Sequence, residues 1–243
     1  MLYTLLFSFI CFLLTTIGAS LVFFVKGENL KTQSILYGFA GGVMLASSIF
    51  SLIIPAKEYC AELNLRAEYI FLICFLLAVL VLMFFFKNNS SSINVKSLVS
   101  GIALHNIPEG MCVGFAFANY ARILSSGSLI SAIMIAIGIG VQNIPEGSSV
   151  SFPLYSKGFS KKKSFLVSVL SGFVEVPFAL IAYFIGLKYM FILPYMLAFS
   201  SALMIIVACC DLLPEAISNN KKWAFLSFVL GFILMMELDI ALG

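Results

Sequence analysis

Runs of about twenty apolar residues follow one another along nearly the whole chain, and this feature most restricts the fold. A helix needs about 20 such residues to cross the hydrocarbon layer of a bilayer. The 243-residue chain is 62% hydrophobic and 10% charged, with a mean hydropathy of +1.10, whereas soluble domains carry about 25% charged residues. The sequence therefore predicts an all-α polytopic membrane protein. The net charge of +3 is too small to indicate a nucleic-acid partner.

Charged residues and clusters of Gly, Pro, Asn and Ser divide the chain into eight predicted transmembrane helices, which we expect to form one domain, 1–243. The predicted ranges are 2–25, 34–55, 67–86, 97–119, 127–152, 163–187, 190–213 and 223–241. A polar cytoplasmic loop is predicted at about 87–96. The first range has no basic segment before it and is long enough to span, so we interpret it as a retained helix.

Basic residues favour the cytoplasmic ends of membrane helices and so predict the orientation. With both termini outside, the inner loops hold ten of the fourteen Lys and Arg residues: Lys26, Lys31, Lys87, Lys96, Lys157, Lys161, Lys162, Lys163, Lys221 and Lys222. The outer loops hold the other four: Lys57, Arg66, Arg122 and Lys188. We therefore predict an N-out, C-out, multi-pass protein of the plasma (cell inner) membrane.

Most of the eleven acids lie in loops or at the ends of the predicted helices, and the other four are Glu109, Glu146, Glu175 and Asp211. Each costs about 2.5–3.5 kcal/mol at mid-bilayer, so together they cost about 12 kcal/mol if nothing compensates them. No Lys or Arg is predicted inside a span to pair with them. Compensation must therefore come from protons, metal ions or water in a cavity. Asp211 lies near an inner end, where a simple helix-end acid is an equally good interpretation.

Two of these acids belong to a motif that occurs twice, as HNIPEG at 105–110 and as QNIPEG at 142–147. Successive helical residues are separated by about 100°, so the polar residues of each motif share one face. The first face carries His105, Asn106 and Glu109, and the second carries Gln142, Asn143 and Glu146. If both helices span, they run antiparallel, and these faces can meet at one depth.

Each motif also contains a proline and a glycine. Pro108 and Pro145 lack a backbone N–H, so each leaves a carbonyl unpaired and predicts a kink in the helix. Gly101, Gly110, Gly140 and Gly147 permit close approach of a neighbouring helix. A broken helix beside ionisable residues is a common form of transporter site. The alternative is a proline-kinked, hydrogen-bonded helix pair without a ligand.

Glu175, in SGFVEVP, is expected to point into the same cavity, with a protonated or capped carboxyl as the alternative. Imidazole together with carboxylate oxygen suits zinc and other first-row divalent ions. A single histidine among oxygen ligands selects loosely, so Zn, Fe(II), Mn and Cd all fit.

HNIPEG followed by a second NIPEG helix resembles the ZIP (Zrt/Irt-like) metal transporter family. TTIGA, FAGGVMLASS, SGFVEVP and LLPEA extend the resemblance along the chain. It implies eight helices in a 3+2+3 arrangement with inverted pseudo-symmetry, inward movement of divalent metal and no ATP hydrolysis. FAGGVMLASSIFSLIIPA and AFSSALMIIVACCDLLPEA are weakly alike, as such a repeat requires.

The resemblance also implies two adjacent metal sites on the fourth, fifth and sixth helices. The first site would use His105, Glu109, Gln142 and Glu146. The second would use Asn106, Asn143 and Glu175, with Glu109 and Glu146 bridging the two ions. Gln142 stands where many members have histidine, which weakens the case for zinc alone. SLIIPA lacks the acid that often flanks its proline, so an outer approach site is not evident.

The sequence therefore predicts a transporter that carries divalent metal, zinc first, into the cytoplasm by alternating access, with no catalytic cofactor. A homodimer is compatible with it. The alternatives are a proton-coupled carrier of an organic solute, a membrane-embedded metalloenzyme, and a structural or sensor protein that binds metal without moving it. An enzyme is disfavoured because neither H-E-x-x-H nor G-x-S-x-G occurs.

Overall fold

The structure, a computed structural model, describes the backbone of residues 1–25, 30–86, 95–156 and 158–242. Within these ranges the side chains of 85–86, 95–105, 153, 156 and 242 are not described. The predicted polar loop at 87–96 therefore lies almost wholly outside the described residues, as does the side chain of His105.

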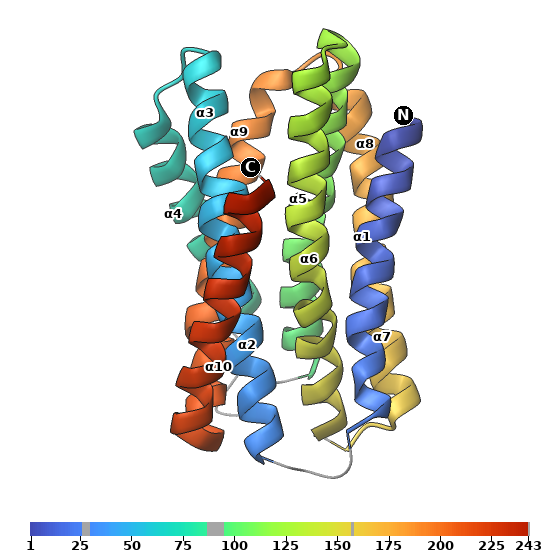
Figure 1. Ribbon diagram of the computed structural model, residues 1–243, viewed down its shortest axis with the longest axis vertical. Helices are drawn as coiled ribbons and strands as arrows, with labels where there is room; N and C mark the ends of the chain where they lie inside the picture. Colours follow the sequence, from blue (N-terminus) through green and yellow to red (C-terminus); the bar gives the residue numbers. More distant parts are fainter. Residues whose placement is uncertain (26–29, 87–94, 157, 243) are drawn as a thin grey trace.

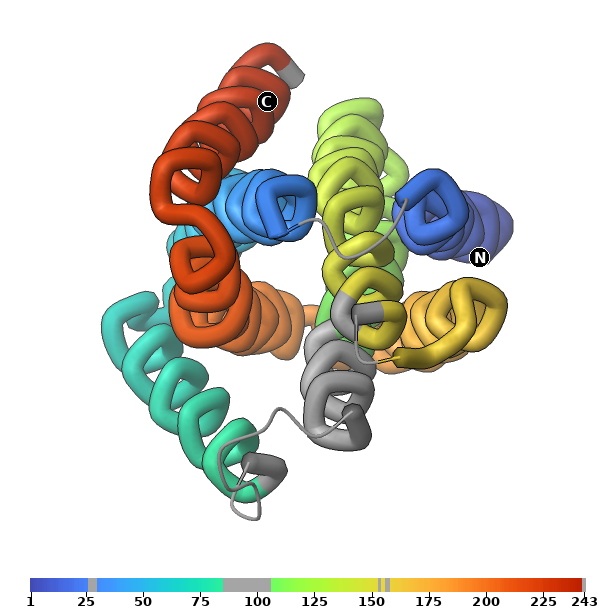
Figure 2. Tube along the Cα trace, turned by 90° about the horizontal axis from the view of Figure 1, so that it is seen from below, coloured from blue at the N-terminus to red at the C-terminus, as the bar shows by residue number. Residues whose placement is uncertain are grey.

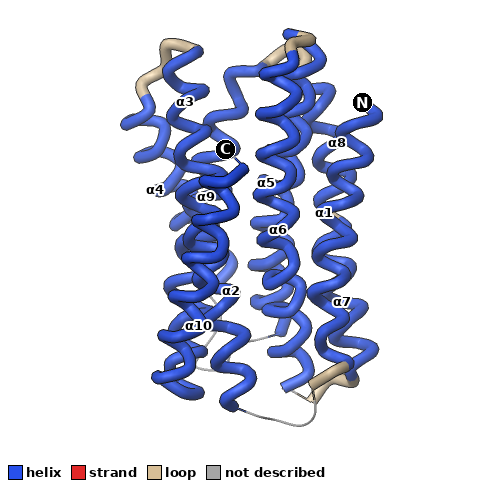
Figure 3. The backbone as a smooth tube through the Cα atoms, viewed as in Figure 1, coloured by secondary structure: helices blue, strands red, loops and turns tan. Residues whose placement is uncertain are grey.

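Every regular element in the described part of the chain is a helix, which confirms the predicted all-α class (Figures 1 and 3). The α-helices are α1 Leu2–Ser20, α2 Leu30–Ser47, α3 Ile54–Glu62, α4 Ala67–Phe86, α5 Val95–Ile123, α6 Ser126–Ser156, α7 Lys161–Phe173, α8 Glu175–Gly186, α9 Leu193–Val207 and α10 Leu213–Leu242. Shorter 3-10 and π-helical segments join some of them: η1 Leu21–Phe23, η2 Ser48–Ile53, η3 Met190–Ile192 and η4 Ala208–Leu212.

Six helical stretches of the described residues are long and apolar enough to cross a membrane. They are Leu2–Phe23, Leu30–Glu62, Ala67–Phe84, Ser126–Phe152, Lys161–Gly186 and Met190–Ala241. Their outward faces are strongly apolar: on α4, for example, Leu72, Leu76 and Leu80 are each more than half exposed. Such faces are unfavourable in water and suit lipid. The chain is therefore an integral, multi-pass membrane protein.

The last of these stretches is longer than one crossing needs. It covers 52 residues, and its helix is interrupted at Asn220, where φ is −164° and ψ is 101°. In the view from below, the tube turns sharply within α10, and the segment before the turn lies beside the segment after it (Figure 2).

The helices form two groups around a central pair. Seen along the bundle, α5 and α6 lie in the middle, with α1, α7 and α8 on one side and α2, α3, α9 and α10 on the other (Figure 2). The most extensive packing joins α2 to α10, α1 to α6 and α5 to α8. Helix α4 is peripheral and packs mainly against α9. Consequently α5 and α6 are covered from both sides.

The two motif prolines do not interrupt their helices, and the kink expected at each proline stays a prediction. Helices α5 and α6 run on through Pro108 and Pro145. One proline removes one hydrogen bond from a long helix, so the helix can continue through it. The interruptions lie elsewhere, at Val174 between α7 and α8 and in the π-helical segments η2 and η4.

The two π-helical segments occupy corresponding places. Segment η2 ends two residues before Pro55, and η4 ends two residues before Pro214. These are the two stretches in which the sequence shows its weak internal similarity. Each of the two similar stretches therefore contains a π-helical segment shortly before its proline.

Both ends of the described chain lie toward the same end of the bundle (Figure 1). Lysines lie at the opposite end, where α2 and α7 begin. The Nζ atom of Lys161 donates hydrogen bonds to the backbone oxygens of Phe23 (3.1 Å) and Val25 (2.7 Å), just beyond the end of the first span. Lys31 lies over the ring of Trp223, 4.0 Å from its centroid.

Candidate functional site

Six of the seven predicted site residues have described side chains, and the fold buries all six near one another. Each is no more than 1% exposed. Helix α5 supplies Asn106 and Glu109, helix α6 supplies Gln142, Asn143 and Glu146, and Glu175 is the first residue of α8. The seventh, His105, precedes Asn106 on α5. The expected meeting of the two motif faces is therefore present in the structure.

Gln142 and Glu109 join the two central helices. The Nε2 atom of Gln142 donates to Oε1 of Glu109 at 3.0 Å and lies 3.6 Å from Sδ of Met204 on α9. On its other side, Oε1 of Gln142 accepts a hydrogen bond from the hydroxyl of Ser47 on α2. The Gln142 amide therefore connects α6 to three other helices.

Asn143 and Asn106 make the corresponding connections on the far side of the pair. The Nδ2 atom of Asn143 donates to both carboxylate oxygens of Glu175, at 2.8 and 2.9 Å, and lies 3.3 Å from the backbone oxygen of Cys11 on α1. The Nδ2 atom of Asn106 donates to the backbone oxygen of Ser171 on α7 at 3.0 Å. Both amide groups therefore turn their N–H donors toward neighbouring helices.

Three oxygens at the centre of this cluster are buried and accept no hydrogen bond from the described residues. They are Oδ1 of Asn106, Oε2 of Glu109 and Oδ1 of Asn143. A buried polar atom without a partner is costly and calls for an explanation, such as an ion or water. Carboxylate and amide oxygens are atoms that divalent cations accept as ligands.

The carboxylates also act on one another. Glu109 and Glu175 both experience electrostatic repulsion from Glu146. A dication placed among them would replace this repulsion by attraction. Among the residues whose side chains are described, no three His, Cys, Asp or Glu groups are close enough to hold a metal ion. The remaining members of the cluster are amides, and His105 lies outside that set.

The motif glycines bring the neighbouring helices close to the site, as predicted. A Cβ atom added to Gly110 would lie 2.4 Å from the backbone oxygen of Glu175. A Cβ atom added to Gly147 would lie 2.0 Å from the backbone oxygen of Thr15 on α1. Only glycine permits these contacts between helix backbones. Gly110 therefore fixes how closely Glu175 approaches α5.

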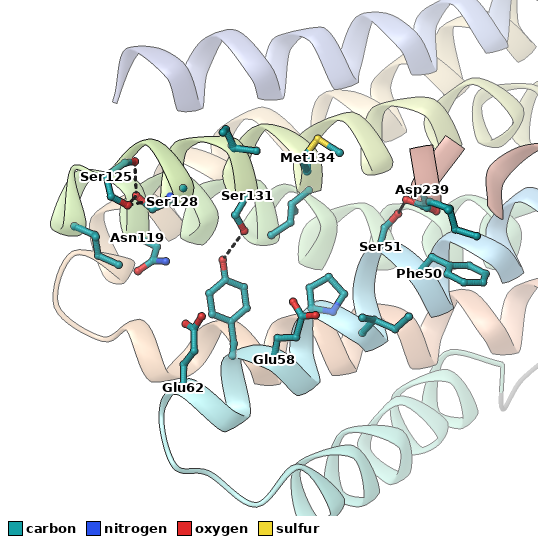
Figure 4. Close-up of a pocket in the computed structure, with 18 residues that line it drawn as sticks. Phe50, Ser51, Glu58, Glu62, Asn119, Ser125, Ser128, Ser131, Met134 and Asp239 are labelled. Carbon is teal, nitrogen blue, oxygen red and sulfur yellow. Dashed lines mark hydrogen bonds between the residues drawn. The ribbon is translucent and has the colours of Figure 1, made fainter. Parts of the chain in front are cut away.

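A cavity of about 610 Å³ opens near the end of the bundle that holds the termini. Glu58 and Glu62 on α3 lie across it from Asn119 and Ser131 (Figure 4). Asp239 of α10 also lines it, and no Lys or Arg is among the described residues of its wall. The cavity is therefore acidic.

The inner end of this cavity lies close to the buried cluster. Ser51 of η2 donates to Oδ1 of Asp239 at 2.6 Å, and both residues line the cavity. Ser51 is one helical turn from Ser47, which contacts Gln142. Toward the other end, the hydroxyl groups of Tyr59 and Ser131 are 3.3 Å apart.

Sequence reasoning missed several of these residues. Ser47 and Met204 are ordinary small and apolar residues of predicted spans, and only packing places them beside Gln142. Glu58 and Glu62 form an i, i+4 acidic pair, which is a visible but weak signal. Asp211 is half-buried in η4, and Glu215 is exposed.

The structure thus defines a class: multi-pass helical membrane proteins with carboxylates and amides gathered inside the bundle. The ZIP zinc transporter family profile matches residues 86–239. The chain is 30% identical over 250 residues to "Zinc transporter ZIPB" of Bordetella bronchiseptica, a match that covers 96% of the chain and 79% of that protein. The chain belongs to the ZIP zinc transporter family.

Two other relatives show the extent of the similarity. "Zinc transporter ZupT" of Chlorobaculum parvum is 31% identical over 259 residues, covering 95% of the chain and 93% of that protein. Human "Zinc transporter ZIP11" is 44% identical over 155 residues, covering 63% of the chain and 45% of that protein. The chain thus matches less than half the length of the human relative.

Proposed function

We propose that the protein moves divalent metal ions, zinc first among them, across the membrane into the cytoplasm. Membership in the family and the names of the relatives support this activity. The observation that carries it is the set of three buried acceptor oxygens, on Asn106, Glu109 and Asn143, that accept no hydrogen bond from the described residues. Their chemistry suits a dication, and their burial between helices suits a site inside the bilayer.

The proposed site holds up to two ions. The first ion would be bound by His105, Glu109, Gln142 and Glu146, and the second by Asn106, Asn143, Glu175 and the two shared carboxylates. Oxygen ligands outnumber the single imidazole nitrogen, so Fe(II), Mn and Cd are expected as further substrates.

The proposed architecture has eight transmembrane helices. Met190–Ala241 supplies two of them because its helix is interrupted at Asn220. The other five apolar stretches supply one each, and α5 is the eighth. The matching π-helical segments η2 and η4 support inverted repeats of three helices around α5 and α6. The lysines opposite the termini support an N-out, C-out orientation in the plasma (cell inner) membrane.

In this orientation the acidic cavity faces outside and serves as the approach to the site. Transport would proceed by alternating access, in which the group containing α1, α5, α6, α7 and α8 moves against the group containing α2, α3, α9 and α10. The contacts of Gln142 with Ser47 and Met204 join these two groups. They must therefore change when the site opens to the other side.

Zinc uptake into proteoliposomes tests the proposal. Glu109→Ala and Glu146→Ala are each expected to reduce the initial rate by more than about tenfold, because each would remove a ligand shared by both ions. Glu215→Ala, at an exposed position, is the matched control and should retain uptake. Uptake that persists without Glu109 and Glu146 would contradict the assignment. Uptake of an organic solute that chelators leave unchanged would favour a proton-coupled solute carrier. Hydrolysis without ion flux would favour a membrane-embedded metalloenzyme.

A further inference from the structure

Ser47 contacts the site from outside both motifs. It is the last residue of α2, it is fully buried, and its hydroxyl donates to Oε1 of Gln142. It belongs to the helix group on the opposite side of α6 from Glu175. Its neighbour Ser48 is equally buried, but the Ser48 hydroxyl donates to the backbone oxygen of Met44 in its own helix, at 2.6 Å.

The hydrogen-bond partners of Gln142 fix which way its amide faces. The Glu109 carboxylate and the Met204 thioether are both acceptors, so the NH₂ group must face them. The amide oxygen therefore faces Ser47. That oxygen is the one atom of the glutamine side chain that can bind a cation. In this arrangement it is occupied by a serine hydroxyl.

We propose that Ser47 is a positioning residue that supports Gln142 in two amide orientations, with and without the cation. This inference rests on the proposed function. When a cation draws the Glu109 carboxylate to itself, the Gln142 NH₂ group loses its acceptor and faces a positive charge. The amide then turns its oxygen to the cation and its NH₂ group to Ser47. A hydroxyl can donate to the oxygen in one orientation and accept from the nitrogen in the other.

Removing the hydroxyl affects the two orientations unequally. Without the hydroxyl, the Gln142 amide oxygen loses a hydrogen-bond donor when the site is empty. When a cation is bound, the Gln142 N–H groups are instead buried without an acceptor. Buried N–H groups without a partner are tolerated less well than carbonyl oxygens. Ser47→Ala is therefore expected to weaken cation binding, by about tenfold for the loss of one buried hydrogen-bond partner.

Zinc binding to the purified full-length protein, measured by competition with a fluorescent chelator, tests this inference together with zinc uptake in proteoliposomes. Ser47→Ala should raise both Kd and KM for zinc about tenfold and leave the maximal rate within about twofold. Ser48→Ala, the matched control, should leave all three unchanged. Ser47→Cys keeps a weak donor on a slightly larger side chain, so it should fall between wild type and Ser47→Ala, and it carries the test if Ser47→Ala does not fold.

A double-mutant cycle separates positioning from a general structural effect. If Ser47 acts through Gln142, Ser47→Ala should add nothing to the loss caused by Gln142→Ala. Wild-type affinity in Ser47→Ala, a fall in maximal rate alone, or additive losses in the double variant would each overturn the inference. The proposed function fails separately, if wild-type vesicles take up no zinc or if Glu109→Ala leaves uptake intact.

Discussion

Asn143 on α6 donates hydrogen bonds to both carboxylate oxygens of Glu175 on α8, at 2.8 and 2.9 Å. The two residues are 32 positions apart in the sequence, and the contact holds the carboxylate of a third helix against the central pair. An amide suits this place because its NH₂ group donates to both oxygens of the acid while its own oxygen, which accepts no hydrogen bond from the described residues, remains available to a cation.

Replacing this amide by an acid should make the protein depend on metal for its stability. In Asn143→Asp, a second carboxylate would face Glu175 at the distance of the former hydrogen bonds. We expect the metal-free protein to lose on the order of 2 kcal/mol, and added zinc to restore most of it. Thermal unfolding with and without zinc measures both effects. Asn64→Asp, at an exposed turn, is the control, and equal metal-free stability of Asn143→Asp and wild type would contradict the expectation.

Removing the one imidazole should change selectivity more than it changes transport as such. His105→Ala would leave oxygen ligands alone in the first site, and oxygen-only sites favour zinc less strongly over manganese. We expect KM for zinc to rise and the preference for zinc over manganese to fall by about tenfold, a free-energy difference of roughly 1.4 kcal/mol. Competition between the two metals in vesicle uptake is the measurement. An unchanged preference would remove His105 from the proposed site.

Adding a methyl group at Gly110 should disturb the site through its backbone. The new Cβ atom would lie 2.4 Å from the backbone oxygen of Glu175, and a helix backbone cannot shift as cheaply as a side chain. We expect Gly110→Ala to destabilise the protein by about 1–3 kcal/mol and to lower zinc uptake. Thermal unfolding and uptake are measured together. In the control Gly127→Ala, the nearest atom would lie 4.0 Å from the new Cβ, so both quantities should match wild type.

Neutralising the acids that line the cavity should slow zinc capture without altering the buried site. Glu58 and Glu62 are exposed acids at the cavity wall, and acidic clefts raise the local concentration of cations. The double variant Glu58→Gln, Glu62→Gln should lower uptake by about two- to fivefold at subsaturating zinc and low ionic strength. The difference should shrink as salt is added. Glu68→Gln, an exposed acid on α4 outside the cavity, should have no such effect; a loss that is independent of salt would contradict steering.

Much of the helical arrangement was predictable because lipid allows few solutions. Backbone groups in hydrocarbon must be paired within a helix. Apolar length alone therefore predicted the described spans, and most of their ends lie within a few residues of the predicted ones. The repeated HNIPEG and QNIPEG motifs likewise placed the buried carboxylates and amides on facing helices. The prolines indicate a missing backbone donor in each motif helix, but they do not interrupt either helix. The interruptions in the described residues include Val174, Asn220, η2 and η4.

The sequence by itself determined that the protein is helical and embedded in lipid, and that acids and amides lie within the predicted spans at helical spacing, because hydropathy and periodicity are local properties of the chain. Only the tertiary structure decided that Ser47 and Met204 meet Gln142, that Asn143 holds Glu175, and that Glu58, Glu62 and Asp239 surround one cavity. These relationships join helices far apart in the sequence. The contacts depend on which helices pack together and at what depth in the bundle. The sequence of a single span contains no information about either of these.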